Sequence, residues 1–193
     1  MDDRAPGSLI PEAIRTLLEE IGEDPSRDGL AGTPDRVRRL YAELTDGYRI
    51  DPDALLNGAA FAVDYDEMVV VRDIEFYSLC EHHLLPFFGK VHVGYLPKGR
   101  VIGLSKIPRI VDMYAHRLQV QERMTQEVAT FLMERLEPKG VGCVIEATHL
   151  CTVMRGVRKQ QATMVTSAML GTFRRDPKTR SEFLAFIGRP AER

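Results

Sequence analysis

The sequence lacks an apolar run of about 18 residues, the length that a membrane-spanning helix needs. It also lacks the charged and apolar leader of a secreted protein at its start. Its net charge is only -2 at pH 7, so it has no overall basic field for the bulk binding of nucleic acid. These absences predict a cytoplasmic protein that engages neither a membrane nor nucleic acid.

Cysteine is scarce as well. The chain has three cysteines, and an odd number without a secretory leader argues against a disulfide framework. The cysteines are therefore interpreted as metal ligands or free thiols. What the sequence does contain is 44% hydrophobic residues in a chain of 193, which is enough for one packed domain with an appended N-terminal element.

Apolar residues recur at helical spacing in the N-terminal part of the chain. The first predicted helix covers residues 10–22, with Gly22 as its stop. A second helix has Thr33 as its N-cap and Pro34 as its first helical residue. Together they predict a helical N-terminal extension over residues 1–60.

Strands and helices follow in blocks over the rest of the chain. Residues rich in β-branched and aromatic side chains predict four strands, over 68–79, 88–96, 141–153 and 161–171. Between the second and third strands we expect one helix capped by Ser105 and another over about 120–136, and a short helix over 177–187 closes the chain. This order predicts an α+β domain over residues 61–193, with an antiparallel four-stranded sheet backed by two helices.

Two short clusters gather soft metal ligands and titratable imidazoles. They are Cys80-Glu81-His82-His83, between the first two predicted strands, and His149-Leu150-Cys151. Zinc binds thiolate sulfur and imidazole nitrogen in a tetrahedron, and a catalytic zinc keeps three protein ligands and one open position. Cys80 and His83 can converge on one ion from a turn, whereas the adjacent His82 should diverge. Spacing alone does not decide which histidine binds the metal.

The predicted strand over 141–153 narrows the choice of metal ligands in the second cluster. Side chains alternate between the faces of a strand, so His149 and Cys151 should point the same way, about 6.6 Å apart. Cys143 lies roughly 26 Å from Cys151 along such a strand, so we interpret it as a core residue. Two alternatives stay open. The thiols are buried small hydrophobes, or the zinc is structural and takes His82 or His149 as its fourth ligand.

A second set of side chains is basic. Arginine offers forked donors that suit phosphate oxygens, and a helix N-terminus favours an anion. The candidate phosphate ligands are Arg36, Arg39, Lys106, Arg109, Arg155, Arg158 and Lys159, with Ser105 beside Lys106. Each of them alone is more typical of a solvated surface charge. Glu122, at a helix start, is either a capping partner or a carboxylate that accepts two parallel N–H bonds from a guanidine-like ligand edge.

The order of these motifs resembles GTP cyclohydrolase I of the zinc-dependent type. The segments that carry the resemblance are Leu79-Cys80-Glu81-His82-His83, Gly89-Lys90-Val91, Gly103-Leu104-Ser105-Lys106-Ile107, Arg109-Ile110-Val111, Gln119-Val120-Gln121-Glu122-Arg123 and Ala147-Thr148-His149-Leu150-Cys151 with Met154-Arg155-Gly156. They cover roughly residues 30–187. The resemblance implies a tunnelling fold, in which sheets of several subunits close into a barrel, and a homodecamer of two pentamers with active sites between subunits.

The resemblance also implies a role for each candidate residue. Zinc is bound by Cys80, His83 and Cys151, while His82 and His149 act as acid and base and Ser105 carries protons in later steps. Guanine is read by Glu122 with Gln121. The ribose and triphosphate are faced by Ser105, Lys106, Arg109 and Arg155, with Arg36 and Arg39 as weaker phosphate ligands.

The implied reaction is the hydrolysis of GTP at C8 of the guanine ring, with release of formate and formation of 7,8-dihydroneopterin triphosphate, the first step of tetrahydrofolate and pterin biosynthesis. Zinc would supply the hydroxide by lowering the pKa of its water. One competing hypothesis is another tunnelling-fold enzyme, such as a pyruvoyl-tetrahydropterin synthase, whose zinc is held by three histidines. The other is a non-catalytic interaction protein stabilised by zinc.

Overall fold

The computed structural model describes residues 8–56, 58 and 60–188, and it divides into two compact units between Thr45 and Asp46. The first unit contains helices α1 (Ile10–Glu20) and α2 (Thr33–Leu44), which pack on each other. Gly22 follows α1 with a φ of +88°, a left-handed conformation that favours glycine, so the predicted stop is confirmed.

The predicted start of α2 is wrong by one residue. Gly32 occupies the N-cap position, and Thr33 is already the first helical residue. The cause is the preceding turn, in which the Thr33 amide donates to the carbonyl of Leu30 at 2.8 Å. The Thr33 hydroxyl donates back to the carbonyl of Gly29 at 3.4 Å and so does not serve as a cap.

The second unit begins at Asp46, within the segment that the sequence assigns to the extension of residues 1–60. Asp46 and Gly47 are joined to this unit by His116, whose Nδ1 lies 2.8 Å from a carboxylate oxygen of Asp46. The amide of Gly47 also donates to the carbonyl of His116 at 3.1 Å. These bonds connect the segment after Thr45 to the sheet-bearing part of the chain.

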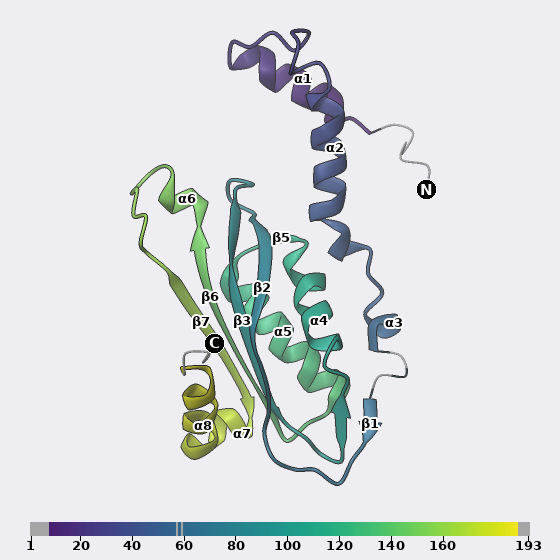
Figure 1. Ribbon diagram of the computed structural model, residues 1–193, viewed down its shortest axis with the longest axis vertical. Helices are drawn as coiled ribbons and strands as arrows, with labels where there is room; N and C mark the ends of the chain where they lie inside the picture. Colours follow the sequence, from purple (N-terminus) through teal and green to yellow (C-terminus); the bar gives the residue numbers. More distant parts are fainter. Residues whose placement is uncertain (1–7, 57, 59, 189–193) are drawn as a thin grey trace. The chain divides into compact units, whose positions relative to one another are not determined.

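The second unit is a mixed α+β structure, which confirms the predicted class (Figure 1). Its helices are η1 (Asp46–Tyr48), α3 (Pro52–Leu56), α4 (Lys106–Ala115), α5 (Gln121–Leu136), α6 (Leu150–Val153), α7 (Thr172–Arg175) and α8 (Pro177–Ile187). Its strands are β1 (Ala60–Ala62), β2 (Val69–Cys80), β3 (Pro86–Leu96), β4 (Arg100–Ile102), β5 (Leu118–Gln119), β6 (Gly140–His149) and β7 (Met164–Gly171). None of the helices within the described ranges combines the length and apolar character needed to cross a membrane.

The main sheet has five strands in the order β5-β2-β3-β6-β7, rather than the predicted four. The four long strands are antiparallel, as predicted, and the short strand β5 joins the edge parallel to β2. A strand of two residues has no periodicity to detect in a sequence, which explains why β5 was not predicted. The strands β1 and β4 form a separate two-stranded sheet.

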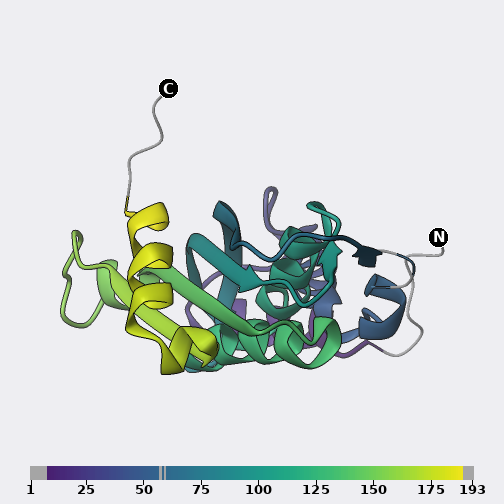
Figure 2. The ribbon, with the colours of Figure 1, turned by 90° about the horizontal axis from the view of Figure 1, so that it is seen from below.

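Helices α4 and α5 cover one face of the main sheet, and the principal core lies between them and the strands (Figure 1). The residues with no exposed surface here include Val91, Val93, Ile110, Val128 and Ile145. Helix α8 stands on the side of the sheet away from α4 and α5 (Figure 2). A smaller core of Val144, Phe173 and Phe183 lies beneath it.

The predicted strand over 141–153 ends early, because β6 stops at His149 and the next four residues form helix α6. The Thr152 hydroxyl donates to the His149 carbonyl at 2.9 Å, and the Met154 amide donates to the Leu150 carbonyl at 3.1 Å. These local bonds replace the strand ladder over Leu150–Val153. The strand predicted over 161–171 likewise begins only at Met164.

Candidate metal centre

Strand β3 brings the two metal-ligand clusters together, because it pairs with both strands that carry them. Leu79 of β2 is opposite Pro86 of β3, and Phe87 of β3 is opposite His149 of β6. The end of β2, the start of β3 and the end of β6 therefore meet at one end of the sheet. This register joins residues that are about seventy positions apart in the chain.

Cys80, His83 and Cys151 form a group whose three ligand atoms all lie within 4.8 Å of one another. Cys80 is the last residue of β2 and is buried, Cys151 is half-buried and His83 is exposed. Sulfur and nitrogen ligands of a tetrahedral zinc ion lie about 3.6 to 3.8 Å apart, given ordinary Zn–S and Zn–N lengths. The three side chains thus fit a zinc ion with small movements and leave one tetrahedral position open.

The Cys151 thiol is affected by its surroundings at this site. Burial raises the pKa of the Cys151 thiol, and the charge and hydrogen bond of the neighbouring Cys80 raise it further, while Arg155 acts in the opposite direction. Two sulfurs at this separation repel as thiolates, and a divalent cation between them removes that cost. The donor set is therefore suited to a metal ion.

The reason given above for grouping His149 with Cys151 was wrong, although both residues lie at this end of the sheet. Cys151 is in the first turn of α6, so strand alternation does not apply to it. Cys143 stays on β6, opposite Val93 and Ala168, and has no exposed surface. Burial raises the pKa of the Cys143 thiol to about 12. Its assignment to the core is confirmed.

The turn that carries His83 is held by backbone hydrogen bonds. The amide of Cys80 donates to the carbonyl of Leu85 at 2.9 Å, and the amide of Leu84 donates to the carbonyl of Cys80 at 2.8 Å. Leu84 has a φ of +56°, a left-handed conformation that is costly for a branched side chain. This strained residue follows His83 directly, so the tight turn sets the direction of the ligand.

The side chain of Arg123, on helix α5, holds the same turn by hydrogen bonds. Arg123 donates through Nη2 to the carboxylate of Glu81 at 2.5 Å and to the carbonyl of Leu118 at 2.9 Å. Its Nε donates to the side-chain oxygen of Gln119 at 3.0 Å. The hydrogen bond from Arg123 lowers the pKa of the Glu81 carboxyl, which keeps it ionised. Glu81 thus connects the turn that carries the ligands Cys80 and His83 to helix α5.

His149 lies beside the metal group and is held on two sides. Its ring stacks on Phe87 with a centroid distance of 4.6 Å and an interplanar angle of 3°. Its Nε2 lies 2.8 Å from the side-chain oxygen of Gln121. Burial lowers the pKa of His149, and the nearby charge of Glu122 opposes that shift. Among the described residues, the three-ligand group includes neither His149 nor His82, so a four-ligand structural site is not formed here.

The residues expected to read guanine lie at the start of α5. Glu122 is exposed in the first turn of the helix, and its charge reaches His149. Gln121 is only 1% exposed, and its side-chain nitrogen already donates to the carbonyls of Ile145 and Met164. Direct substrate binding by Gln121 stays a prediction, because a ligand would have to replace one of these bonds.

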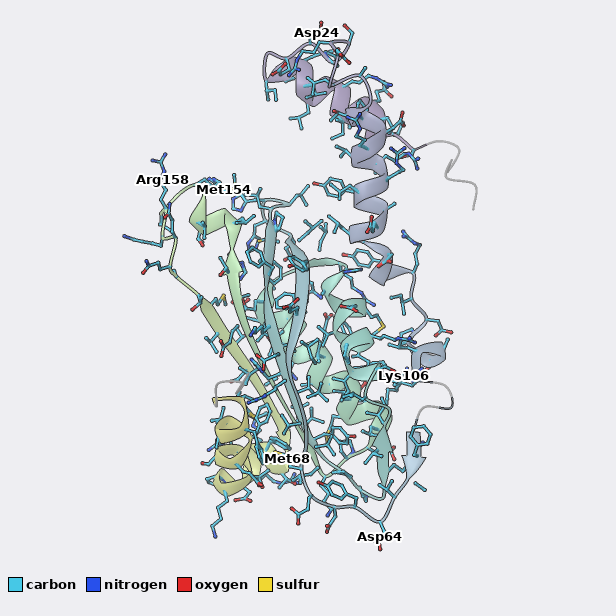
Figure 3. The ribbon with its side chains drawn as sticks, viewed as in Figure 1. Asp24, Asp64, Met68, Lys106, Met154 and Arg158 are labelled. Carbon is cyan, nitrogen blue, oxygen red and sulfur yellow. The ribbon has the colours of Figure 1, made fainter. Side chains whose placement is uncertain are left out.

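The expected phosphate ligands lie in three different places. Arg155 is exposed in the connection after α6, close enough for its charge to reach Cys151. Lys106, at the start of α4, lies away from Met154 and Arg158 of that connection (Figure 3), and its Nζ donates to the carbonyl of Leu55 at 2.6 Å. The phosphate set is therefore not gathered around the metal group within the second unit.

Ser105 and Arg109 accompany Lys106 at the start of α4, and both are exposed. Ser105 occupies the N-cap position of α4, as predicted, but it has helical angles (φ -66°, ψ -14°), and within the described structure its hydroxyl makes no capping hydrogen bond. Because the N-cap side chain works from an extended backbone, the helical conformation of Ser105 removes that function. Arg36 and Arg39 belong to α2 of the first unit.

Several residues that shape the site were not predicted from the sequence. Phe87 and Thr166 gave no signal, because their contacts with His149 and Gln121 depend on strand register. Arg123 was part of a motif but had no assigned role. An arginine close in sequence to a glutamate of the same helix gives no hint of a bond to Glu81, which comes 42 positions earlier.

The fold and the site together define a candidate metal-dependent enzyme of the α+β class, with three protein ligands and further histidines beside them. Comparison with known families then identifies the chain more closely. The model of the GTP cyclohydrolase I family matches residues 10–188, and the chain belongs to this family.

Curated relatives agree with this assignment. GTP cyclohydrolase 1 of Chlorobaculum tepidum is 56% identical over 187 residues, which are 97% of this chain and 83% of the relative. GTP cyclohydrolase 1 of Leptospira biflexa is 58% identical over 174 residues, covering 90% of this chain and 95% of the relative. GTP cyclohydrolase 1 of Methylococcus capsulatus is 56% identical over 182 residues, covering 94% and 98%.

Proposed function

We propose that this chain is a zinc-dependent GTP cyclohydrolase, which converts GTP to formate and 7,8-dihydroneopterin triphosphate as the first step of tetrahydrofolate and pterin biosynthesis in the cytoplasm. The observation that carries the proposal is the convergence of Cys80, His83 and Cys151 beside His149, in a chain of the GTP cyclohydrolase I family. The overall reaction uses two water molecules in two hydrolytic steps and releases one when the pterin ring closes.

The metal is held by Cys80, His83 and Cys151 in this proposal. When bound there, zinc supplies Lewis acidity and lowers the pKa of water toward 7, which makes hydroxide available near neutral pH. The remaining work of the site is to orient the guanine ring and to move protons, and it is done by side chains of the protein.

His149 passes the proton that the attacking water loses to N7 of guanine as the oxygen adds to C8. When the bond from C8 to N9 then breaks, the hydroxyl proton of the adduct goes to N9. His149 is suited to its task because the stacked ring of Phe87 fixes its plane. A proton carrier must lie within hydrogen-bond reach of the reacting atom in one orientation, and a fixed ring meets that condition. His82, exposed in the same turn as His83, and Ser105 carry protons in the later hydrolysis and rearrangement.

Glu122 binds the edge of guanine that carries N1–H and the 2-amino group. A carboxylate accepts two parallel N–H bonds from this edge, which adenine does not offer. An adenine nucleotide would leave the carboxylate unpaired, and a site built for such bonds rejects the wrong ligand strongly. The exposed position of Glu122 at the start of α5, near His149, supports this assignment.

The triphosphate and ribose are bound by Ser105, Lys106, Arg109 and Arg155, with Arg36 and Arg39 as further phosphate ligands. Lys106 lies away from the connection that carries Arg155, so one chain does not gather the whole set (Figure 3). This separation supports active sites that are built between subunits. We therefore propose a homodecamer of two pentamers in which sheets of neighbouring subunits close into the barrel of a tunnelling fold. Strand β7 lies at an edge of the main sheet, and the backbone groups of an edge strand can pair with a strand of a neighbouring subunit.

The direct test is to incubate the purified, zinc-loaded protein with GTP and to measure formate together with the fluorescent pterin that forms on oxidation. We expect both products in equal amounts. His149→Ala should keep zinc and assembly but lose turnover by at least about 100-fold, the usual contribution of a positioned acid or base. Glu122→Ala should also keep zinc and assembly but lose turnover, because the guanine edge loses the carboxylate that pairs with it. Glu134→Ala changes an exposed glutamate further along α5 and is the matched control.

The outcomes distinguish the roles of His149 and Glu122 from the proposed activity of the protein. Unmodified protein that is fully loaded with zinc and yields no formate would refute the proposed function. Formate release at the normal rate from His149→Ala or Glu122→Ala would refute only the role given to that residue. Equal losses in Glu122→Ala and Glu134→Ala would point to a general effect on the helix instead.

A further inference from the structure

A chain of hydrogen bonds connects the first turn of α5 to the ring of His149. The Thr125 hydroxyl donates to the backbone carbonyl of Gln121 at 2.7 Å and lies 2.6 Å from the Thr166 hydroxyl. The side-chain nitrogen of Gln121 donates to the Thr166 hydroxyl at 3.1 Å. The side-chain oxygen of Gln121 then meets Nε2 of His149 at 2.8 Å. Gln121 and Thr125 are each 1% exposed.

The direction of the Gln121 amide is fixed by two backbone carbonyls. Its nitrogen lies 3.0 Å from the carbonyl oxygen of Ile145 and 2.9 Å from that of Met164. A carbonyl only accepts, so the NH2 end of the amide must face this pair. The reverse orientation would place three oxygens together without a hydrogen between them. The amide oxygen of Gln121 therefore faces His149.

The directions of the hydroxyl hydrogen bonds follow from the same distinction between donors and acceptors. The hydrogen of Thr125 goes to the carbonyl of Gln121, which only accepts. The hydrogen of Thr166 is then directed to Thr125, and a lone pair of Thr166 accepts from the Gln121 amide. The two hydrogens of the Gln121 amide are shared among three acceptors, the Thr166 hydroxyl and the carbonyls of Ile145 and Met164, and the amide oxygen is left to face His149.

These hydrogen bonds determine the tautomer of His149. Because the Gln121 oxygen can only accept, Nε2 of His149 must carry the hydrogen. In the neutral ring Nδ1 then has the lone pair. Phe87 holds the ring plane, so the nitrogen that exchanges protons is the same one in every turnover.

We propose that Gln121 acts on the reaction through His149, as a positioning residue that holds the Nε2–H tautomer, and that Thr166 and Thr125 support it. The proposal rests on the function proposed above, and it assigns to Gln121 a task other than contact with guanine. A residue that reads guanine affects the binding of GTP, whereas a residue that fixes a tautomer affects the proton transfer that follows.

Kinetics distinguish the two tasks. Gln121→Met keeps the length of the side chain and removes both ends of the amide. We expect kcat to fall about 10- to 100-fold with KM for GTP unchanged, the same range as when the hydrogen-bond partner of a metal-bound histidine is lost. Thr166→Val should lower kcat less, since the two carbonyls still hold the amide, and Thr166→Ser should restore it.

Thr130→Val is the matched control, because its hydroxyl accepts from the exposed Gln126 on the same helix and lies outside the chain of bonds. It should leave kcat and KM at their normal values. A rise of KM in Gln121→Met at normal kcat would overturn the proposal and favour direct reading of guanine. Failure of Thr166→Ser to exceed Thr166→Val in kcat would overturn the part assigned to Thr166.

A spectroscopic measurement tests the tautomer without any turnover. In protein labelled with ¹⁵N-histidine, the nitrogen that bears hydrogen and the bare nitrogen give separate signals, and His149→Asn identifies those of residue 149. We expect unmodified protein to show hydrogen on Nε2 and Gln121→Met to show a mixture. Hydrogen on Nδ1 in the unmodified protein would overturn the proposal even if Gln121→Met does not fold. Absence of formate from GTP would instead refute the proposed function and leave this measurement valid.

Discussion

Replacing Arg123 by Met removes the bond that connects the ligand-bearing turn to helix α5. Arg123 bonds to the Glu81 carboxylate at 2.5 Å, and Glu81 lies between the ligand Cys80 and the next ligand, His83. Both side chains are partly exposed, at 43% and 35%, so solvent screens the pair. The backbone bonds of the turn remain, including the 2.9 Å bond from Cys80 to Leu85. We therefore expect a loss of zinc affinity of about tenfold, the lower end of the range for outer partners of metal ligands.

The assay is a competition for zinc between the protein and a chelator of known affinity, at fixed pH and salt. Arg135→Met is the matched control, because Arg135 lies near the other end of α5, is 44% exposed and pairs with Asp53 of α3. It should bind zinc normally. The reasoning is refuted if Arg123→Met binds zinc as tightly as the unmodified protein. It is equally refuted if Arg135→Met loses as much affinity, since the effect would then not pass through the turn.

Three further predictions concern other parts of the second unit. Cys151→Ser should lose zinc, whereas Cys143→Ala should keep one zinc per chain. Because Cys143→Ala leaves a small cavity in the core, it should also lower the free energy of unfolding by about 1 kcal/mol. Metal analysis and thermal unfolding check both variants, and loss of zinc from Cys143→Ala would contradict the ligand set. Gly89→Ala should destabilise the fold by about 3 kcal/mol or more in denaturant unfolding, because the new Cβ would lie 1.9 Å from the Glu146 carbonyl oxygen, and a normal unfolding midpoint would contradict this packing. Burial lowers the pKa of His92 below 6.5. The charges of Asp73 and Glu146 raise this pKa, and those of Lys90 and Arg72 lower it further. The unfolded chain then takes up the proton first, so stability falls as the pH drops below about 6.5; the melting temperature of His92→Gln should fall less between about pH 7.5 and pH 5.5 than that of the unmodified protein, and equal falls would exclude His92 as the cause.

Most of the helices and long strands could be predicted from the sequence, because their signals are local. The apolar spacing of residues 10–22 and about 120–136 predicts α1 and α5, and the β-branched residues of β2 and β3 predict strands. Errors arose where local bonds compete with the strand pattern. At Leu150–Val153, the apolar residues fit a strand as well as a helix, and the bonds from Thr152 and Met154 decide for the helix.

The ligand types were also a property of the sequence. Two cysteines near histidines predict a zinc site, since few other sites need this combination. The sequence could not show how Cys151 reaches Cys80 and His83, and the explanation by strand alternation was wrong. The two clusters meet because β3 pairs with both β2 and β6 in one register, which depends on contacts along the whole sheet.

The sequence by itself thus determined the order of the long helices and strands, the donor atoms for a metal and the exclusion of Cys143 from the metal site. Only the tertiary structure decided that Arg123 fixes the ligand turn and that Gln121 is buried against His149. The physical reason is that helix propensity and ligand chemistry belong to single residues and short segments. The direction of an amide, or the tautomer of a histidine, is set by acceptors such as Ile145 and Met164, which folding brings from distant strands.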